Sequence, residues 1–104
     1  LDKATKAQLD RGARMVETLK QAQYSPLSVA EQVLVIFTAV RGHLADIPVD
    51  KVVLFHTDFL KFMRTSHPEI AAAITEMQKL DDPLEADLTK AIEEFKDTIS
   101  YKES

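Results

Sequence analysis

Three histidines and one pair of adjacent aspartates are the side chains of this sequence that could bind a metal ion or transfer a proton. The histidines are His43, His56 and His67, and no two of them are separated by three or four positions. Zinc ligands on one helix need that spacing, and the chain has no cysteine that could complete a zinc site. We therefore predict no metal site, with His43 in a turn and His56 on a helix.

The aspartates are Asp81 and Asp82, which could form a catalytic carboxylate pair or serve as two metal ligands. Pro83 follows them directly, and an acidic residue before a proline is typical of the start of a helix. A general acid also needs a pocket that shifts its pKa, and no segment of the sequence indicates such a pocket. Helix capping is therefore the preferred interpretation of both residues.

Glycine content and nucleophile motifs also argue against catalysis. The chain has two glycines, Gly12 and Gly42, which are too far apart to form a phosphate-binding loop. No Gly-x-Ser-x-Gly motif is present. These patterns favour a structural or interaction role, and they make a small helical enzyme the weakest hypothesis.

Length and charge narrow the class of protein further. The chain has 104 residues, which fits a single domain over residues 1–104. A formal net charge of -4 argues against nucleic acid as the main partner, because binding phosphates needs a basic surface. No run of about 18 apolar residues occurs, so we expect no direct insertion into a membrane. Position 1 is Leu rather than Met, so we expect a processed chain or a piece of a longer one.

Apolar periodicity predicts an all-α protein, a compact bundle of about five helices with no sheet. The first helix is expected over about residues 2–21, capped by Asp2, and the second over about residues 28–44, where Ser28 and Glu31 form a capping box. Helical spacing predicts the apolar faces of these two helices: Leu9, Ala13, Val16 and Leu19 on the first, and Val29, Val33, Ile36, Phe37, Val40 and Leu44 on the second.

Three more helices are expected after a turn at residues 42–50. The third begins near Pro48 and ends near Thr65, the fourth begins after His67-Pro68, and the last begins near Pro83. The same spacing predicts the inward residues of these helices: Val52, Phe55, Phe59, Phe62 and Met63; then Ile70, Ala73, Ile74 and Met77; then Leu84, Leu88, Ala91, Ile92, Phe95 and Ile99.

The first half of the chain carries a dense pattern of particular residues. It consists of Arg11-Gly12-x-Arg14-x-x-Glu17-x-Leu19-Lys20-Gln21-x-Gln23-Tyr24-Ser25-Pro26, followed by Glu31-Gln32-Val33-x-x-Ile36 and Gly42-x-Leu44. This pattern resembles the C-terminal helical domain of the alpha subunit of F-type proton-translocating ATP synthase. From Pro48 onward the likeness is weaker, and Ala30 and His56 stand where that family often has an acidic residue.

The resemblance implies a non-catalytic structural and coupling domain of a rotary, proton-transporting ATP synthase. In that family ATP, ADP and Mg bind an upstream domain, so no cofactor is expected in this segment. Alternating alpha and beta subunits surround a central gamma shaft, so the expected partners are the gamma and beta subunits. The expected location is a peripheral membrane complex on the cytoplasmic face of a bacterial inner membrane, or on an organelle inner membrane.

The resemblance also assigns a candidate site, because in the family the turn between the second and third helices approaches gamma. In this sequence the turn consists of Arg41, Gly42, His43, Leu44, Ala45, Asp46, Ile47, Pro48, Val49, Asp50 and Lys51. It is the counterpart of an acidic lever loop of the beta subunit, although here two acidic residues stand beside two basic ones.

Two further expectations stay open on the sequence alone. One face of the bundle should pack on the rest of the subunit, so the isolated segment should expose an apolar patch larger than that of a typical monomer. The alternative function is a stand-alone helical adaptor that binds a partner helix. For that function Phe55, Phe59, Phe62 and Met63 would line a peptide groove rather than a core.

Overall fold

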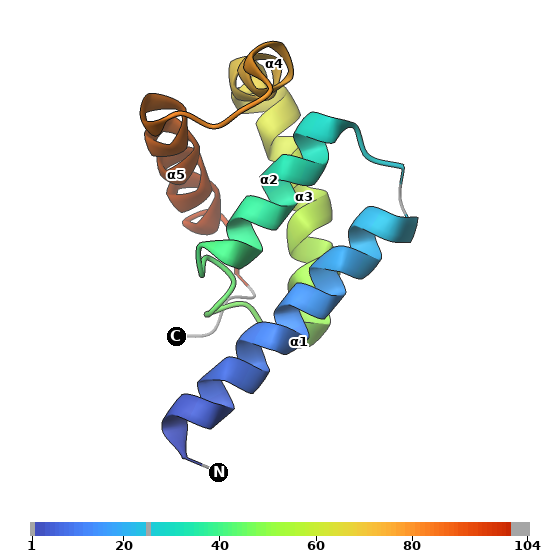
Figure 1. Ribbon diagram of the computed structural model, residues 1–104, viewed down its shortest axis with the longest axis vertical. Coiled ribbons are helices and arrows are strands. Elements are labelled where there is room, and N and C mark those ends of the chain that lie inside the picture. The colour runs from blue at the N-terminus through green and yellow to red at the C-terminus, as the bar shows by residue number, and fades with distance from the viewer. Residues whose placement is uncertain (1, 25, 101–104) are drawn as a thin grey trace.

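The structure is a computed structural model that describes residues 2–24 and 26–100, and these residues fold into five α-helices and one short 3-10 helix (Figure 1). No strand occurs in these two ranges, as the all-α prediction requires. The helices in chain order are α1 (Lys3–Tyr24), α2 (Val29–Val40), the 3-10 helix η1 (Val49–Lys51), α3 (Val52–Ser66), α4 (Pro68–Met77) and α5 (Asp82–Lys96).

The helices pack around a core to which α2 and α3 both contribute. Figure 1 shows α1 and α2 side by side and antiparallel, with α4 and α5 at the other side of the molecule. α2 contacts α1, α3 and α4, whereas α3 contacts every other α-helix. The N-terminal part of α1 projects beyond the rest, and the molecule measures 44 × 26 × 26 Å.

Side-chain caps fix where three of the helices begin. The Thr5 N–H donates to Asp2 Oδ1 at 2.7 Å, and the Leu84 N–H donates to Asp81 Oδ1 at 3.0 Å. These two bonds confirm the caps predicted for the first and last helices, because a side-chain oxygen satisfies an N–H that the helix itself leaves unpaired.

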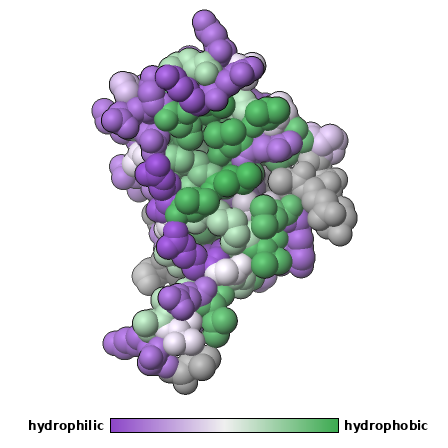
Figure 2. Space-filling view, in the orientation of Figure 1, coloured by the Kyte–Doolittle hydropathy of each residue, from purple (hydrophilic) through white to green (hydrophobic). Residues whose placement is uncertain are grey.

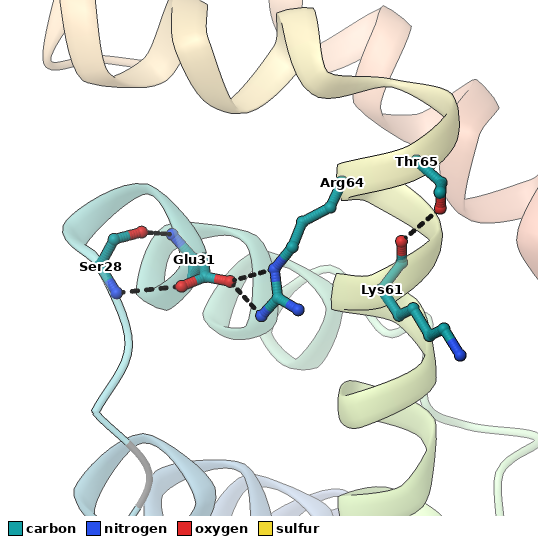
Figure 3. Close-up of polar contacts among 5 residues, drawn as sticks. All are labelled: Ser28, Glu31, Lys61, Arg64 and Thr65. Carbon is teal, nitrogen blue, oxygen red and sulfur yellow. Dashed lines mark hydrogen bonds and ion pairs between the residues drawn. The ribbon is translucent and has the colours of Figure 1, made fainter.

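The capping box at the start of α2 also links α2 to α3 (Figure 3). Ser28 Oγ accepts from the Glu31 N–H, and Glu31 Oε1 accepts from the Ser28 N–H, both at 3.2 Å. Glu31 Oε2 accepts from Nε and Nη2 of Arg64 at 3.0 and 2.6 Å. Partial burial acts to raise the pKa of Glu31, but the hydrogen bonds from Arg64 and Ser28 outweigh it, so the pKa lies below its usual value.

The predicted inward faces of α3 and α5 are confirmed. Phe55, Phe59 and Phe95 are nearly fully buried, and their ring centroids lie 5.3 to 5.9 Å from one another. Such edge-to-face and offset pairs stabilise a core beyond the area they bury. The stripe predicted as a possible peptide groove is therefore core, with Phe62 at its edge.

The apolar face predicted for α1 is largely exposed rather than buried. Leu9, Val16 and Leu19 are 58%, 51% and 50% exposed, whereas Arg14 and Thr18 are buried on the opposite side. The reason is that α1 lies at the edge of the bundle and contacts it through Arg14 and Thr18, which hydrogen-bond to other parts of the bundle, and through the partly buried Met15. Periodicity revealed an apolar stripe on α1 but not which face meets the core.

α2 differs from its prediction in both its inner face and its end. Val29, Ile36 and Val40 are 75%, 36% and 45% exposed. The buried residues are Ala30, Leu34, Val35, Phe37, Thr38 and Ala39. The helix ends at Val40 instead of Leu44, because a turn with left-handed Gly42 follows. Met77 on α4, predicted inward, is 39% exposed because it lies in the last turn of its helix.

Candidate functional site

The candidate site is the turn over residues 41–51, here named the α2–α3 turn, and its backbone is a series of short reversals. Gly42 has a φ of 78°, a left-handed conformation that glycine adopts without strain. This conformation lets the His43 N–H donate to the Thr38 carbonyl at 2.9 Å, which closes the end of α2. The Lys51 N–H donates to the Pro48 carbonyl at 2.8 Å and so closes η1.

Two of the predicted site residues belong to the core. Leu44 and Ile47 are 2% and 0% exposed, so their side chains hold the turn on the bundle and do not face outward. The residues of the turn that are exposed are Arg41, Gly42, Ala45, Val49, Asp50 and Lys51, and His43, Asp46 and Pro48 are partly buried. Contact with a partner through the exposed residues stays a prediction.

Three cationic side chains from distant parts of the sequence bind backbone carbonyls at the turn. Arg14 Nε on α1 donates to the Ile47 carbonyl at 2.7 Å, and Lys96 Nζ at the end of α5 donates to the His43 carbonyl at 2.8 Å. Arg11 Nη2 on α1 donates to the Val40 carbonyl, the last of α2. The Val40 carbonyl lies at the C-terminus of α2, where carbonyls lack partners within the helix and attract positive charge, which explains the contact with Arg11.

Most of the charge on the turn itself is paired. Lys96 Nζ lies 2.5 Å from Asp46 Oδ1, and Arg41 forms an ion pair with Glu85 on α5. The Arg41 guanidinium also lies over the Phe37 ring, 5.1 Å from its centroid. Within the described part of the chain, Asp50 and Lys51 have no ion-pair partner, so these two are the charges that the turn presents to solvent.

His43 adds an aromatic contact at the same place. Its ring stacks on Phe37 with 5.9 Å between centroids. Burial lowers the pKa of His43, and the positive charges of Lys96 and Arg41 lower it further, against smaller opposite effects of Glu93 and Asp46. The ring is therefore neutral at neutral pH, as a side chain packed beside two cations should be.

Comparison with known protein families decides what kind of domain this is. The family model described as the ATP synthase alpha/beta chain, C terminal domain, matches residues 1–95. The chain belongs to this family. The resemblance inferred from the pattern in the first half of the sequence is thereby confirmed.

Three relatives that the chain matches are ATP synthase alpha subunits. It is 53% identical to the ATP synthase subunit alpha of Syntrophomonas wolfei subsp. wolfei over 100 residues, 96% of this chain and 20% of that protein. It is 53% identical to the subunit alpha of Desulforudis audaxviator over 96 residues, 92% of this chain and 19% of that protein. For the subunit alpha of Mycolicibacterium smegmatis the identity is 51%, with 92% and 18% covered. The chain thus spans about a fifth of the length of these relatives.

In this ATP synthase domain the three histidines occupy separate environments. His56 on α3 is fully buried, and its Nε2 lies 2.7 Å from Thr18 Oγ1 on α1. His67 directly precedes α4, and its ring lies 3.4 Å from Glu69 Oε1 and 3.1 Å from Glu94 Oε2. Across residues 2–24 and 26–100, no three histidine, aspartate or glutamate side chains are grouped so as to hold a metal ion.

Sequence reasoning found the turn but missed what holds it. Arg14 and Lys96 lie 33 and 53 positions from the residues whose carbonyls they bind. A basic residue within an otherwise ordinary helix gives no sign of such a distant partner. The signal that could have indicated Arg14 is its place opposite the Leu9, Val16 and Leu19 stripe, had that stripe been assigned to the surface.

Of the helices in the described ranges, none is both long and apolar enough to cross a membrane.

Proposed function

We propose that this domain is the non-catalytic coupling part of an ATP synthase alpha subunit. It contacts the gamma shaft through the exposed side of the α2–α3 turn and contacts neighbouring beta subunits during rotary ATP synthesis and hydrolysis. The observation that carries the proposal is the anchoring of this turn to both α1 and α5 in a chain of the ATP synthase family. The same family membership favours a coupling domain over a stand-alone adaptor.

The anchored turn suits a mechanical role. Close-packed helices move as a nearly rigid body, so a force on the turn displaces the bundle and does not merely bend a loop. Rotation of the shaft can change a nucleotide site only by favouring one subunit conformation over another. A turn tied to the first and last helices of the bundle supports that kind of transmission.

The proposal assigns no nucleotide chemistry to this segment. ATP or ADP and Mg²⁺ would bind the upstream domain of the subunit, and the reaction would take place there. The complex would be peripheral to a membrane, as the bacterial relatives suggest. We place it on the cytoplasmic face of a bacterial inner membrane as part of the proposal.

The test replaces exposed residues of the turn in the complete alpha subunit. Val49, Asp50 and Lys51 are exposed, so Val49→Ser, Asp50→Ser and Lys51→Ser together should leave the bundle folded. We expect roughly tenfold weaker binding of gamma to the reconstituted alpha–beta ring, since an apolar contact and two charges leave the interface. The measurement is the titration of gamma onto the assembled ring.

A matched control exists at the end of α4. Glu76→Ser, Met77→Ser and Lys79→Ser remove one acid, one base and one apolar side chain of similar exposure, 39% for Met77 against 36% for Val49. Figure 1 shows that α4 lies at the far end of the molecule from the turn. Equal gamma affinity for the two triple variants would overturn the proposal.

A further inference from the structure

The carbonyls that the three cations bind are spaced along one short segment. They belong to Val40, His43 and Ile47, so the segment is held near its beginning, its middle and its later part. Arg11 and Arg14 reach it from α1, and Lys96 reaches it from α5. Figure 1 shows the segment lying between these two helices.

Arg14 is a costly residue to place where it lies. It is 8% exposed, and its hydrogen-bond partners are backbone carbonyls, that of Ile47 at 2.7 Å and that of Asp10 at 2.9 Å. Burying a cation without a carboxylate partner is unfavourable, and an apolar side chain would fill the same space without that cost. A guanidinium makes hydrogen bonds of defined direction, because its donors lie in one plane and so fix the position of the acceptor.

Lys96 performs the corresponding task from the other side. Its ammonium group donates to the His43 carbonyl and pairs with the Asp46 carboxylate, so it fixes both the backbone and a side chain of the turn. Its side chain is 17% exposed, so the ion pair is partly shielded from water and less screened than one on the surface. Charge-assisted hydrogen bonds of this kind are stronger than neutral ones.

We propose that Arg14 and Lys96 are positioning residues that hold the α2–α3 turn in the one orientation in which it meets the shaft. This inference rests on the function proposed above. Neither residue need touch the shaft. Each acts through the carbonyl that it binds, and together they tie the orientation of the turn to the positions of α1 and α5.

The experiment uses the assembled ATP synthase with substitutions in the complete alpha subunit. Lys96→Met removes the charge and the donors but keeps most of the side-chain length. We expect the amides of residues 42–51 to exchange with solvent roughly tenfold faster, since the turn opens more often without its charged bond. We also expect fewer protons pumped per ATP hydrolysed, with the hydrolysis rate itself maintained. Lys96→Arg should restore both quantities, which a loss of packing alone would not predict.

We expect Arg14→Met to change both quantities in the same direction. Because Arg14 is buried, its variant could assemble poorly, and in that case the Lys96→Met variant alone tests the inference. Matched controls are Lys20→Met on α1 and Lys90→Met on α5, which remove exposed cations from the same helices and should change neither readout. Unchanged amide exchange in Lys96→Met would overturn the inference.

Faster exchange with unchanged coupling would overturn it as well, and the Val49, Asp50 and Lys51 triple variant then separates two cases. If that variant still weakens gamma binding, the proposed function stands and only the positioning role is wrong. If it does not, the proposed function has failed too.

Discussion

At the scale of single residues, His56 is a titratable side chain with no solvent exposure between α1 and α3. Its partner Thr18 also lies within hydrogen-bond distance of the Arg14 carbonyl, at 2.9 Å. A threonine hydroxyl has one proton to donate, and the carbonyl can only accept. Thr18 therefore donates to Arg14 and accepts from His56, which places a proton on Nε2. His56 Nδ1 is buried and has no hydrogen-bond partner among the described residues, and burial lowers the pKa of the ring, so the ring is neutral.

This arrangement predicts a specific loss of stability in mild acid. Burial lowers the pKa of His56 from 6.5 to about 4. Between those two values the unfolded chain binds a proton that the folded chain does not, so the free energy of unfolding falls as the pH is lowered. The free energy of unfolding is not affected by this residue above about pH 6.5. By about pH 4 the protonation of His56 in the unfolded chain has lowered it by up to about 3 kcal/mol. Urea unfolding at several pH values measures it.

The control for this prediction is His56→Leu, which keeps a buried side chain but cannot titrate. The variant shares every carboxylate with the parent, so both lose stability in acid for that common reason. We expect the parent to have the steeper dependence, by about one proton, between about pH 6.5 and pH 4. Identical slopes would mean that His56 does not titrate in the unfolding reaction.

At the scale of helices, the positions of the helices were predicted more accurately from the sequence than the faces that they bury. The caps were predictable because Asp2, Ser28 and Asp81 act within one helical turn of themselves. α5 was predictable because its charged residues leave only one apolar face. The inner face of α2 was not predictable, because α2 carries apolar side chains on several sides. The packing of the neighbouring helices decides which of these side chains are buried. The contacts of Arg14 and Lys96 depend on the whole fold, so no local pattern indicates them.

The capping box of α2 gives a prediction at this scale. Ser28→Ala removes the acceptor for the Glu31 N–H and leaves that donor without its partner, which should cost about 1 kcal/mol of unfolding free energy. Ser66→Ala, at the exposed last residue of α3, is the matched control and should change stability by less than about 0.5 kcal/mol. Urea unfolding of the two variants compares them. An equal loss of unfolding free energy in both variants would show that the capping box does not stabilise α2.

At the scale of the whole molecule, the unexpected exposure on α1 and α2 combines into one surface. Figure 2 shows apolar side chains gathered over α2 and the adjoining part of α1. Beside α2 the surface is hollowed into a cleft of about 510 Å³, lined by Val29, Val33, Ile74, Thr75, Gln78, Lys79 and Leu80. Typical soluble monomers keep contiguous apolar patches small. The exposed residues of the two stripes predicted to face the core therefore form a surface suited to contact with other protein.

The last prediction follows from that surface and concerns the 104-residue chain on its own. We expect it to bind a hydrophobic dye and to self-associate, because Leu9, Val16 and Leu19 stay exposed when nothing covers them. Replacing these three residues with Gln should reduce dye fluorescence and light scattering while helical content, measured by circular dichroism, is kept, since their side chains are at least half exposed. Thr57→Gln and Thr65→Gln, which alter exposed polar positions of α3, serve as the control. A parent chain that is monomeric and binds no dye would show that this face is tolerated in water, and the argument for a covering partner would lose its basis.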